Sequence, residues 1–567
     1  MRAQRGENRE ADLARGGVAL REIEIGADAA GDERAVGAER AVAGNVGEAL
    51  HDDDGAVNGD GFRRGRESEG EAGEILFGGH GVERRSKRKP QRHGGTKKNP
   101  GRVLSPKAQK AQKLTKGFCV TCAFCGQKPP RASRFPRLIK SFDRRESIRT
   151  LALMRAILLF AVISCAASLS AANWPAWRGP THDGVTEETD LPLRWSATEN
   201  VKWKAPLPDR GNSTPVVWGD RVFVTQAIEK EQRRLLMCFD KRTGKLVWTA
   251  GITCTDNEPT HATNPYCAAS PATDGERVVV SYGSAVYCYD FAGHELWKRA
   301  DLGVQKQIWG NGASPVIAGD RVFFNFGPGE KTVLYCFDKK TGRTLWEHAE
   351  PGGNTGEAGG PAWIGSWADP LLRRVAARDE LFMMWPGRVC AFDPATGREL
   401  WTCAGMNPLA YNSPLFADGV VVAMGGFNGA ALAVRAGGDG DVTATHRVWH
   451  LPKVTQRIGN GVLYAGHHYI LTDGATAECR DLKTGALVFS ERLKGTGPTA
   501  QNWSSLVRSG DRLYAVNQGG DAFVFRAAPK FELLATNSIG DKVIGSMAVS
   551  DGMIFIRGYR NLWCIGR

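Results

Sequence analysis

The chain has 567 residues, 42% of them hydrophobic, and a formal net charge of +13 at pH 7. Residues 1–150 contain 31 Lys and Arg against 21 Asp and Glu, so ten of the thirteen excess positive charges lie there. The rest of the chain is nearly neutral, which argues against nucleic-acid binding by that part.

Residues 1–153 form a basic leader with little hydrophobic periodicity, and we expect it to be disordered. Residues 84–149 hold 21 basic residues and only two acidic ones, Asp143 and Glu146. Such a run can bind nucleic acid, but its composition favours a solvated tail. Cys119, Cys122 and Cys125 have zinc-like spacing without an evident fourth ligand, so we predict no metal site there.

A secretory signal peptide is predicted at residues 154–172. A charged start at Met154 and Arg155 is followed by the apolar run 156–163 and by the small residues 166–172, which suit cleavage before Asn173. The apolar run is too short to span a bilayer, so we expect no transmembrane segment.

This position of the signal predicts that translation starts at Met154 and that residues 1–153 are a mis-called gene start. A second reading of the same segment makes Cys165 a lipid-anchored residue. Under either reading we expect a periplasmic or secreted protein of the bacterial envelope.

From residue 238 onward one phrase recurs. It stands at 238–248 (CFDKRTGKLVW), 336–346 (CFDKKTGRTLW) and 391–401 (AFDPATGRELW), with more divergent copies at 288–297 and 479–489. A self-similarity with a period of about 40–55 residues indicates a solenoid, a propeller or an array.

Each unit reads as a four-stranded antiparallel meander. In the first unit, the β-rich runs are 216–218, 221–224, 235–240 and 246–248. Gly219-Asp220 and Thr243-Gly244 supply turns between them, since glycine tolerates a positive φ. Packing such sheets around an axis buries their faces, and closing the ring protects their edges.

The fourth strands can be counted by one large apolar residue in each: Trp203, Trp248, Trp297, Trp346, Trp401, Trp449, Phe489 and Leu533. The first of these, near 200–205, has no three strands before it, and the last three strands, between Ser546 and Ile565, have no fourth strand after them. We therefore predict an all-β, eight-bladed propeller over 173–567, whose last blade is closed by the N-terminal strand. The tryptophans are expected to fill the gaps between blades.

The residues that lead into the first strand of each blade should line one mouth of the central channel. Many of them are small and polar, and long insertions follow blade 1 and precede blades 3 and 4. The predicted ligand-binding residues at this funnel are Asn212, Ser213, His261, Asn264, Tyr266, Trp309, Asn311, Trp367, Asn412, Asn460, Asn502 and Trp503. For any single Ser or Asn, turn chemistry at a strand start remains an alternative explanation.

Cysteines recur at the third-strand position, as expected for small buried core residues. Cys254 and Cys267 differ, because they bracket an insertion and could form a disulfide in an oxidising compartment. No G-x-S-x-G, H-E-x-x-H or P-loop motif occurs, so no catalytic residues and no metal ligands are predicted.

The repeat Ser314-Pro315-x-x-x-Gly319-Asp320-Arg321-Val322-Phe323-Phe324, followed by the phrase ending at Trp346, resembles the repeat of the pyrroloquinoline-quinone-type propellers. The opening 174–185 (WPAWRGPTHDGV) is similar to that of secreted proteins with PQQ-binding-like repeats. The resemblance covers about 173–567 and implies the quinoprotein alcohol dehydrogenase-like fold.

That superfamily contains quinone- and Ca²⁺-dependent dehydrogenases and non-enzymatic members such as BamB, which binds partner proteins. The chain lacks the adjacent cysteine pair of many alcohol-oxidising members, and the family's calcium ligands and catalytic aspartate find no matching positions. We therefore expect a binding scaffold without a cofactor, with an envelope protein, a peptide or a glycan bound at the loop face. The alternative is a PQQ- and Ca²⁺-dependent dehydrogenase of alcohols or sugars.

Overall fold

The computed structural model describes residues 172–567 except 256–257, 308, 331, 351–363, 427–428 and 456–457. The predicted leader 1–153, the signal segment up to residue 171 and Cys165 lie outside the described residues, so those expectations stay predictions. Within the described part, no helix is long and apolar enough to cross a membrane.

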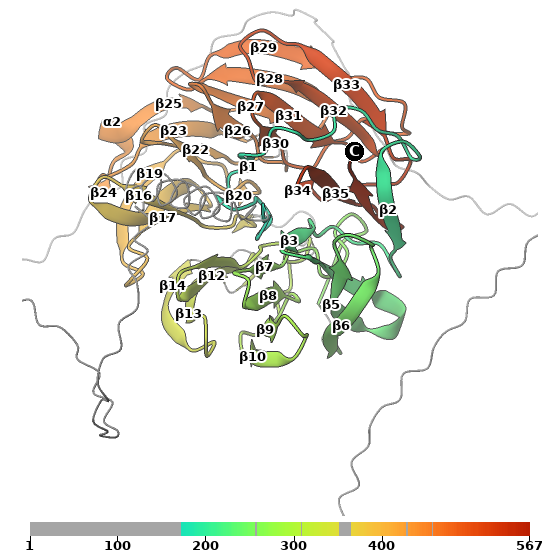
Figure 1. Ribbon diagram of the computed structural model, residues 1–567. Coiled ribbons are helices and arrows are strands. Elements are labelled where there is room, and N and C mark those ends of the chain that lie inside the picture. The colour runs from blue at the N-terminus through green and yellow to red at the C-terminus, as the bar shows by residue number, and fades with distance from the viewer. Residues whose placement is uncertain are drawn as a thin grey trace, which may run out of the picture. The chain divides into compact units, whose positions relative to one another are not determined.

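Eight antiparallel sheets are arranged around a common axis, which confirms the predicted eight-bladed propeller (Figure 1). In most blades, the labelled first strand lies nearer the centre than the labelled fourth strand. Blade 1 consists of β3 (Val216–Trp218), β4 (Arg221–Ile228), β5 (Arg233–Asp240) and β6 (Leu246–Thr253), and blade 2 of β7 (Ala272–Thr273), β8 (Arg277–Ser281), β9 (Val286–Asp290) and β10 (Glu295–Arg299). Blade 3 consists of β11 (Val316–Ala318), β12 (Arg321–Phe326), β13 (Thr332–Asp338) and β14 (Thr344–Glu350), and blade 4 of β16 (Leu371–Val375), β17 (Arg378–Trp385), β18 (Arg388–Phe392) and β19 (Glu399–Ala404).

The second half of the ring repeats this pattern. Blade 5 consists of β21 (Leu415–Ala417), β22 (Val420–Met424), β23 (Ala431–Arg435) and β25 (Arg447–Leu451), and blade 6 of β26 (Val462–Tyr464), β27 (His467–Leu471), β28 (Thr476–Asp481) and β29 (Leu487–Arg492). Blade 7 consists of β30 (Val507–Ser509), β31 (Arg512–Val516), β32 (Asp521–Arg526) and β33 (Leu533–Ser538), and blade 8 of β34 (Ala548–Ser550), β35 (Met553–Arg557), β36 (Asn561–Ile565) and β2 (Val201–Pro206).

Short elements connect the blades. β1 (Val185–Thr186) pairs with β30, β15 (Gly365–Ser366) pairs with β20 (Leu409–Ala410), and β24 (Gly440–Asp441) pairs with the outer strand β19, all in parallel. The helical turns are η1 (Glu229–Glu231) and α2 (Thr443–His446). β24 and α2 belong to an insertion in blade 5 that reaches back to blade 4 and covers its edge.

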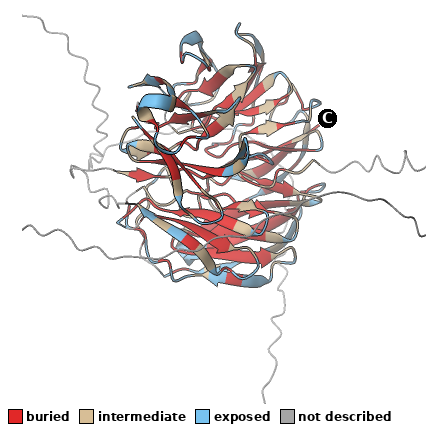
Figure 2. Ribbon diagram, turned by 90° about the vertical axis from the view of Figure 1, so that its left-hand side faces the viewer, coloured by how far each residue is buried: buried red, intermediate tan, exposed pale blue. Residues whose placement is uncertain are grey.

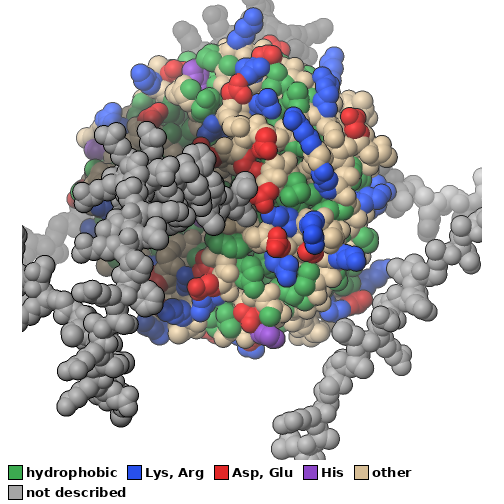
Figure 3. All heavy atoms as spheres, viewed as in Figure 1, with side chains coloured by type: hydrophobic (Ala, Val, Ile, Leu, Met, Phe, Trp, Pro, Cys, Tyr) green, Lys and Arg blue, Asp and Glu red, His purple; other side chains and the backbone are tan. Residues whose placement is uncertain are grey.

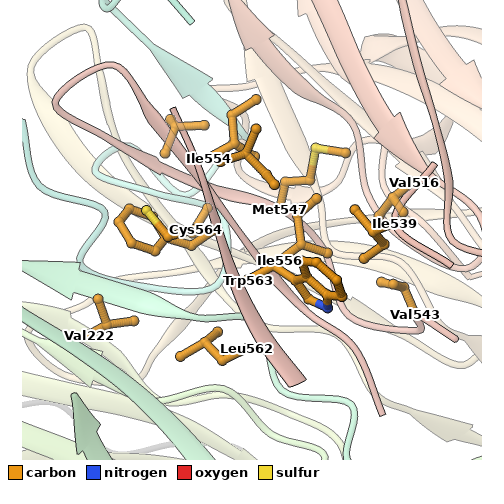
Figure 4. Close-up of a cluster of buried hydrophobic side chains, with 14 of the residues drawn as sticks. Val222, Val516, Ile539, Val543, Met547, Ile554, Ile556, Leu562, Trp563 and Cys564 are labelled. Atoms are coloured by element: carbon orange, nitrogen blue, oxygen red, sulfur yellow. The ribbon is translucent and has the colours of Figure 1, made fainter. Parts of the chain in front are cut away.

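The N-terminal strand closes the ring as predicted. β2 pairs antiparallel with β36, so blade 8 is built from both ends of the propeller sequence. The core of blade 8 packs on both neighbours: Ile556 and Trp563 lie near Val516 and Ile539 of the blade 7 region, and Val222 of blade 1 belongs to the same cluster (Figure 4). Closure therefore rests on a continuous hydrophobic core as well as on strand pairing.

The tryptophans of the repeated phrase pack between blades, also as predicted. A Cβ added to Gly342 would lie 2.6 Å from Cε3 of Trp297, which belongs to the preceding blade. The indole N–H of Trp297 also donates to the carbonyl of Lys339 in the same turn, at 2.8 Å. Glycines pack against a preceding tryptophan in five such contacts: Gly244 on Trp203, Gly293 on Trp248, Gly342 on Trp297, Gly397 on Trp346 and Gly485 on Trp449.

Burial falls from the inner strands to the outer ones. The middle of β5 is buried throughout, whereas β6 alternates between exposed and half-buried residues, and Figure 2 shows the same contrast across the blades. On the uncovered part of the face in Figure 3, Lys and Arg are interspersed with Asp and Glu. That part of the surface therefore has none of the single-sign character of a nucleic-acid interface.

The Trp–Gly contact predicts the effect of Gly342→Ala. The added methyl group would meet the Trp297 ring, so we expect a free energy of unfolding lower by about 1–3 kcal/mol than that of the control Gly319→Ala. Gly319 lies in another turn of blade 3, also has a positive φ (60° against 70°), and has nothing within 4 Å of an added Cβ. Urea unfolding followed by circular dichroism measures the difference; equal losses in the two variants would contradict this packing role.

Candidate functional site

A closed belt of eight hydrogen bonds surrounds the axis. In every blade, the residue two positions before the first strand accepts a hydrogen bond from the backbone N–H of its counterpart in the preceding blade, at 2.7–3.1 Å. The belt runs through Thr214, Ser270, Ser314, Asp369, Ser413, Asn460, Ser505 and Ser546, and the N–H of Ser546 donates to Thr214 to close it. Because all eight side chains are buried, the belt fixes where each blade begins.

The segment before β2 closes one end of the channel. Trp174 forms a β-bridge with Val217, near the far end of β3, and the carbonyl of Pro175 accepts from Thr273 in β7. The buried Arg178 guanidinium donates to the carbonyls of Gly461 and Leu506, at 2.6 and 2.7 Å, in front of blades 6 and 7. This segment thus crosses from blade 1 to blade 7 and places Trp177 against the belt.

A pocket of about 430 Å³ lies on the other side of the belt, among the loops that lead into the first strands. We call these the axial loops. Four tryptophans, one tyrosine and several small polar side chains form its wall, and its lining residues are Trp177, Asn212, Thr214, Thr263, Asn264, Ala268, Ser270, Trp309, Gly312, Ser314, Trp367, Asp369, Tyr411, Ile458, Trp503, Ile544, Gly545 and Ser546. Its size and apolar wall with a few polar groups are those of a small-ligand site.

Local pairing holds the aromatic side chains in place. Trp367 follows β15, its backbone N–H donates to the carbonyl of Ala410 at 2.8 Å, and its indole N–H donates to the carbonyl of Gly310 at 2.9 Å. Its ring stacks on Tyr411, with ring centres 4.8 Å apart. The indole N–H of Trp503 donates to Asp473 at 2.8 Å. These rings therefore have fixed positions around the pocket.

The loop before blade 2 is held by a buried ion pair. Arg234 contacts Glu258 at 2.6 Å, with both side chains under 8% exposed, and the Tyr266 hydroxyl donates to the Glu258 carbonyl at 2.6 Å. Farther along, the side-chain amide of Asn264 donates to the carbonyl of Trp309 at 2.6 Å. The loop thereby brings Asn264 to the pocket wall, against the loop before blade 3.

Five of the twelve predicted ligand-binding residues line this pocket: Asn212, Asn264, Trp309, Trp367 and Trp503. The structure brings them together from five axial loops.

The other seven lie outside the pocket wall. Asn412 and Asn502 each use their side-chain amide on nearby backbone carbonyls, and Asn460 is a belt residue. Ser213 bonds Thr225 and Arg557 in the seam between blades 1 and 8. Of these four, only Asn502 makes a local turn contact, since its amide donates to the Ser504 carbonyl two residues on. The other three bond to a neighbouring blade or its loop.

The remaining three support the loops. The ring of His261 lies 4.3 Å from that of Trp309, and the carboxamide of Asn311 accepts from the backbone of Ala313 at 3.0 Å. Tyr266 packs beneath Arg234, whose guanidinium carbon is 4.6 Å from the ring centre. These three residues support the loops that form the pocket but do not line it themselves.

The sequence analysis missed Asp369, the one belt residue with an ionisable side chain. Asp369 is 7% exposed, its Oδ1 accepts from the Ser314 N–H at 2.7 Å, and no ion pair within the described residues includes it. Burial raises its pKa to about 8, against which the hydrogen bonds from Ser314 act only partly. Its signal was present in the sequence, because Asp369-Pro370 stands in register with Ser314-Pro315.

The quinone and Ca²⁺ of the alternative reading do not fit this pocket. Pyrroloquinoline quinone carries several carboxylates, but among the described lining residues there is no Lys, Arg or His to pair with them. Asp369 is the sole carboxyl in the same set, whereas Ca²⁺ takes six to eight oxygen ligands, usually with more than one carboxylate.

The Cys254–Cys267 disulfide that the sequence allows is not formed in this structure. Cys267 is a free, buried thiol in the structure. Burial raises its pKa to about 12, which disfavours the thiolate needed for disulfide formation.

One group of side chains elsewhere has the spacing of a metal site. His348, Glu350 and Glu399 have ligand atoms within 4.8 Å of one another. The guanidinium of Arg388 donates to both carboxylates, so a positive charge already occupies the position between them. The trio is best described as an ion-pair cluster.

The raised pKa of Asp369 predicts a pH-dependent stability. The folded protein keeps this proton up to about pH 8, whereas an aspartate in the unfolded chain loses it near pH 4. The folded state then binds more protons between these values, so the free energy of unfolding falls as pH rises, by at most about 1.4 kcal/mol per pH unit.

Asp369→Asn keeps an acceptor for the Ser314 N–H but cannot titrate. We expect urea unfolding between pH 5 and pH 8 to show a less negative slope for this variant than for the parent, with the exposed Asp439→Asn as the control. Identical slopes in all three proteins would show that Asp369 is already ionised at low pH.

Comparison with known proteins agrees with this architecture. Comparison with curated protein sequences gives no match. Among solved structures, BamB from Moraxella catarrhalis is 13% identical, with 64% of this chain and 98% of that chain covered and a TM-score of 0.45. Quinohemoprotein alcohol dehydrogenase from Comamonas testosteroni is 12% identical over 70% and 81% of the two chains, with a TM-score of 0.50. A europium-containing methanol dehydrogenase is 13% identical over 69% and 90%, also at 0.50.

At such identities, the structural likeness shows the fold alone. A family model described as outer membrane protein assembly factor BamB matches residues 232–491 and, in a second overlapping match, residues 330–567. Together the two matches span 232–567, which is more than half of the chain and includes blades 2 to 7 and three of the four strands of blade 8. The chain therefore belongs to the family of BamB-like β-propellers.

Proposed function

We propose that this protein is a binding propeller of the bacterial envelope that takes a glycan into the pocket formed by the axial loops. The observation that carries the proposal is the pocket wall itself, in which four tryptophans and a tyrosine surround small polar side chains. The flat apolar face of a sugar ring packs on an indole ring, while its hydroxyl groups need hydrogen-bond partners at the edge.

The belt supplies such partners. Thr214, Ser270, Ser314 and Ser546 line the pocket, and in the belt each of their side-chain oxygens accepts a hydrogen bond. Accepting leaves the hydrogen of each hydroxyl for another acceptor, which for Ser314 is Asp369. The amide groups of Asn212 and Asn264 add further polar atoms higher on the wall.

Binding without catalysis is the simpler role for this wall. A glycosidase of the common type needs two carboxyl groups on opposite sides of the scissile bond. The described lining contains one, Asp369. The envelope location rests on the BamB-like family and on the signal peptide predicted at 154–172.

Co-sedimentation with insoluble chitin, cellulose and peptidoglycan tests the proposal. The protein should sediment with at least one of them, and Trp367→Ala should weaken this binding at least tenfold because it removes a stacking face. Trp218→Ala, a half-exposed tryptophan outside the pocket, should bind like the parent. Far-UV circular dichroism checks that both variants are folded.

Two results would contradict the proposal. The first is sedimentation with none of the three polysaccharides. The second is binding that Trp367→Ala leaves unchanged. Either one would turn attention to an envelope protein or peptide as the occupant of the axial loops.

A further inference from the structure

One of the eight belt positions has a carboxyl side chain, which the belt itself does not require. Each position needs one acceptor for one backbone N–H, and five serines, one threonine and one asparagine provide it. Asp369 provides the same acceptor with Oδ1, but a buried carboxyl without a cation is costly. A serine would serve the belt equally well, so the second carboxylate oxygen calls for a separate explanation.

The surroundings of Asp369 favour a positive charge. The side chain lines the pocket, and the hydrogen bonds that its carboxyl accepts come from Ser314, with no Lys, Arg or His among the described lining residues. It is the one ionisable group among the described lining residues apart from the Tyr411 hydroxyl. The pocket therefore contains the site of a negative charge and no charge to balance it.

The aromatic wall of the pocket also favours a positively charged ligand. Trp177, Trp309, Trp367, Tyr411 and Trp503 come from five different segments and all line this pocket. The face of an aromatic ring is the negative part of its quadrupole, so aromatic rings that line a pocket together with a carboxylate favour an organic ammonium ion.

We propose that the glycan bound here carries a free amino group, as in a glucosamine unit, and that its ammonium pairs with Asp369 inside the aromatic wall. This inference rests on the proposed function, since it names the class of glycan. The aromatic rings would hold the sugar ring and the cation, the belt hydroxyls would bond its oxygens, and Asp369 would select the amine over the N-acetyl or hydroxyl group at the same carbon.

The proposed pairing of the ammonium with Asp369 predicts a measurable release of protons on binding. Without ligand, burial holds the pKa of Asp369 at about 8, so at pH 6.5 the carboxyl is mostly neutral. A neighbouring ammonium favours the ionised form, so binding should release close to one proton from Asp369 to the buffer. A neutral sugar should release none.

The experiment compares three β-1,4-linked disaccharides that differ only at the second carbon: glucosamine disaccharide, its N-acetylated counterpart and cellobiose. Calorimetric titration of the full chain at pH 6.5, in two buffers of different ionisation enthalpy, gives affinity and proton release together. We expect the amino disaccharide to bind at least tenfold more tightly than the other two, with close to one proton released. Asp369→Asn should bring the three affinities within about twofold and abolish the release.

The outcomes separate this inference from the proposed function. If cellobiose binds as tightly as the amino disaccharide, the amine is not recognised, although a glycan site remains. If no disaccharide binds but choline or lysine amide does, the ammonium site stands and the glycan proposal is wrong. If none of these ligands binds, both proposals are overturned. Asp369→Ser, which keeps a belt acceptor, provides a second variant should Asp369→Asn fold poorly.

Discussion

The propeller depends on a ring of hydrogen bonds in which each blade accepts a backbone N–H from its neighbour. A fourth-strand tryptophan fixes the distance between two blades at the periphery, but only the belt sets the position of every first strand relative to the axis. The bond from Ser546 to Thr214 joins the last blade to the first, so the belt is closed at the same blade that β2 completes. Each bond contributes about 0.5–1.5 kcal/mol net, and breaking one would leave a buried N–H unsatisfied.

The same ring of hydrogen bonds also forms part of the pocket. The belt narrows the channel, the segment around Trp177 closes it on one side, and the axial loops add aromatic rings on the other. The result is a fixed pocket whose polar groups come largely from a structural element. Burial raises the pKa of the one carboxyl in this place to about 8, and under our proposal an ammonium group would favour its charged form. Asp369 would then serve both the scaffold and the choice of ligand.

The sequence predicted the parts of this structure that repeat. Fourth-strand residues such as Trp297 and Phe489 gave the blade number, and the unmatched strand at Trp203 gave the closure, because each follows from local pattern. The pocket was predicted less well. Asn502 looks like a pocket residue but bonds to nearby backbone, whereas Trp177 reaches the pocket from a segment that no repeat marks, and Tyr411 lies beside the predicted Asn412. Distance across a ring is not encoded in spacing along the chain. Asp369 was detectable by its register with Ser314-Pro315, but its environment, and with it the raised pKa, required all eight blades.

The central claim is that Asp369 is a buried, neutral carboxyl that becomes charged when an ammonium group enters the pocket. A ¹³C NMR titration of its carboxyl carbon, assigned with the Asp369→Asn variant, tests this most directly. We expect a midpoint near pH 8 in the free protein and a fall of at least about 2.5 pH units with glucosamine disaccharide, as release of nearly one proton at pH 6.5 requires. A free midpoint near pH 4, or a midpoint that the disaccharide leaves in place, would contradict the account.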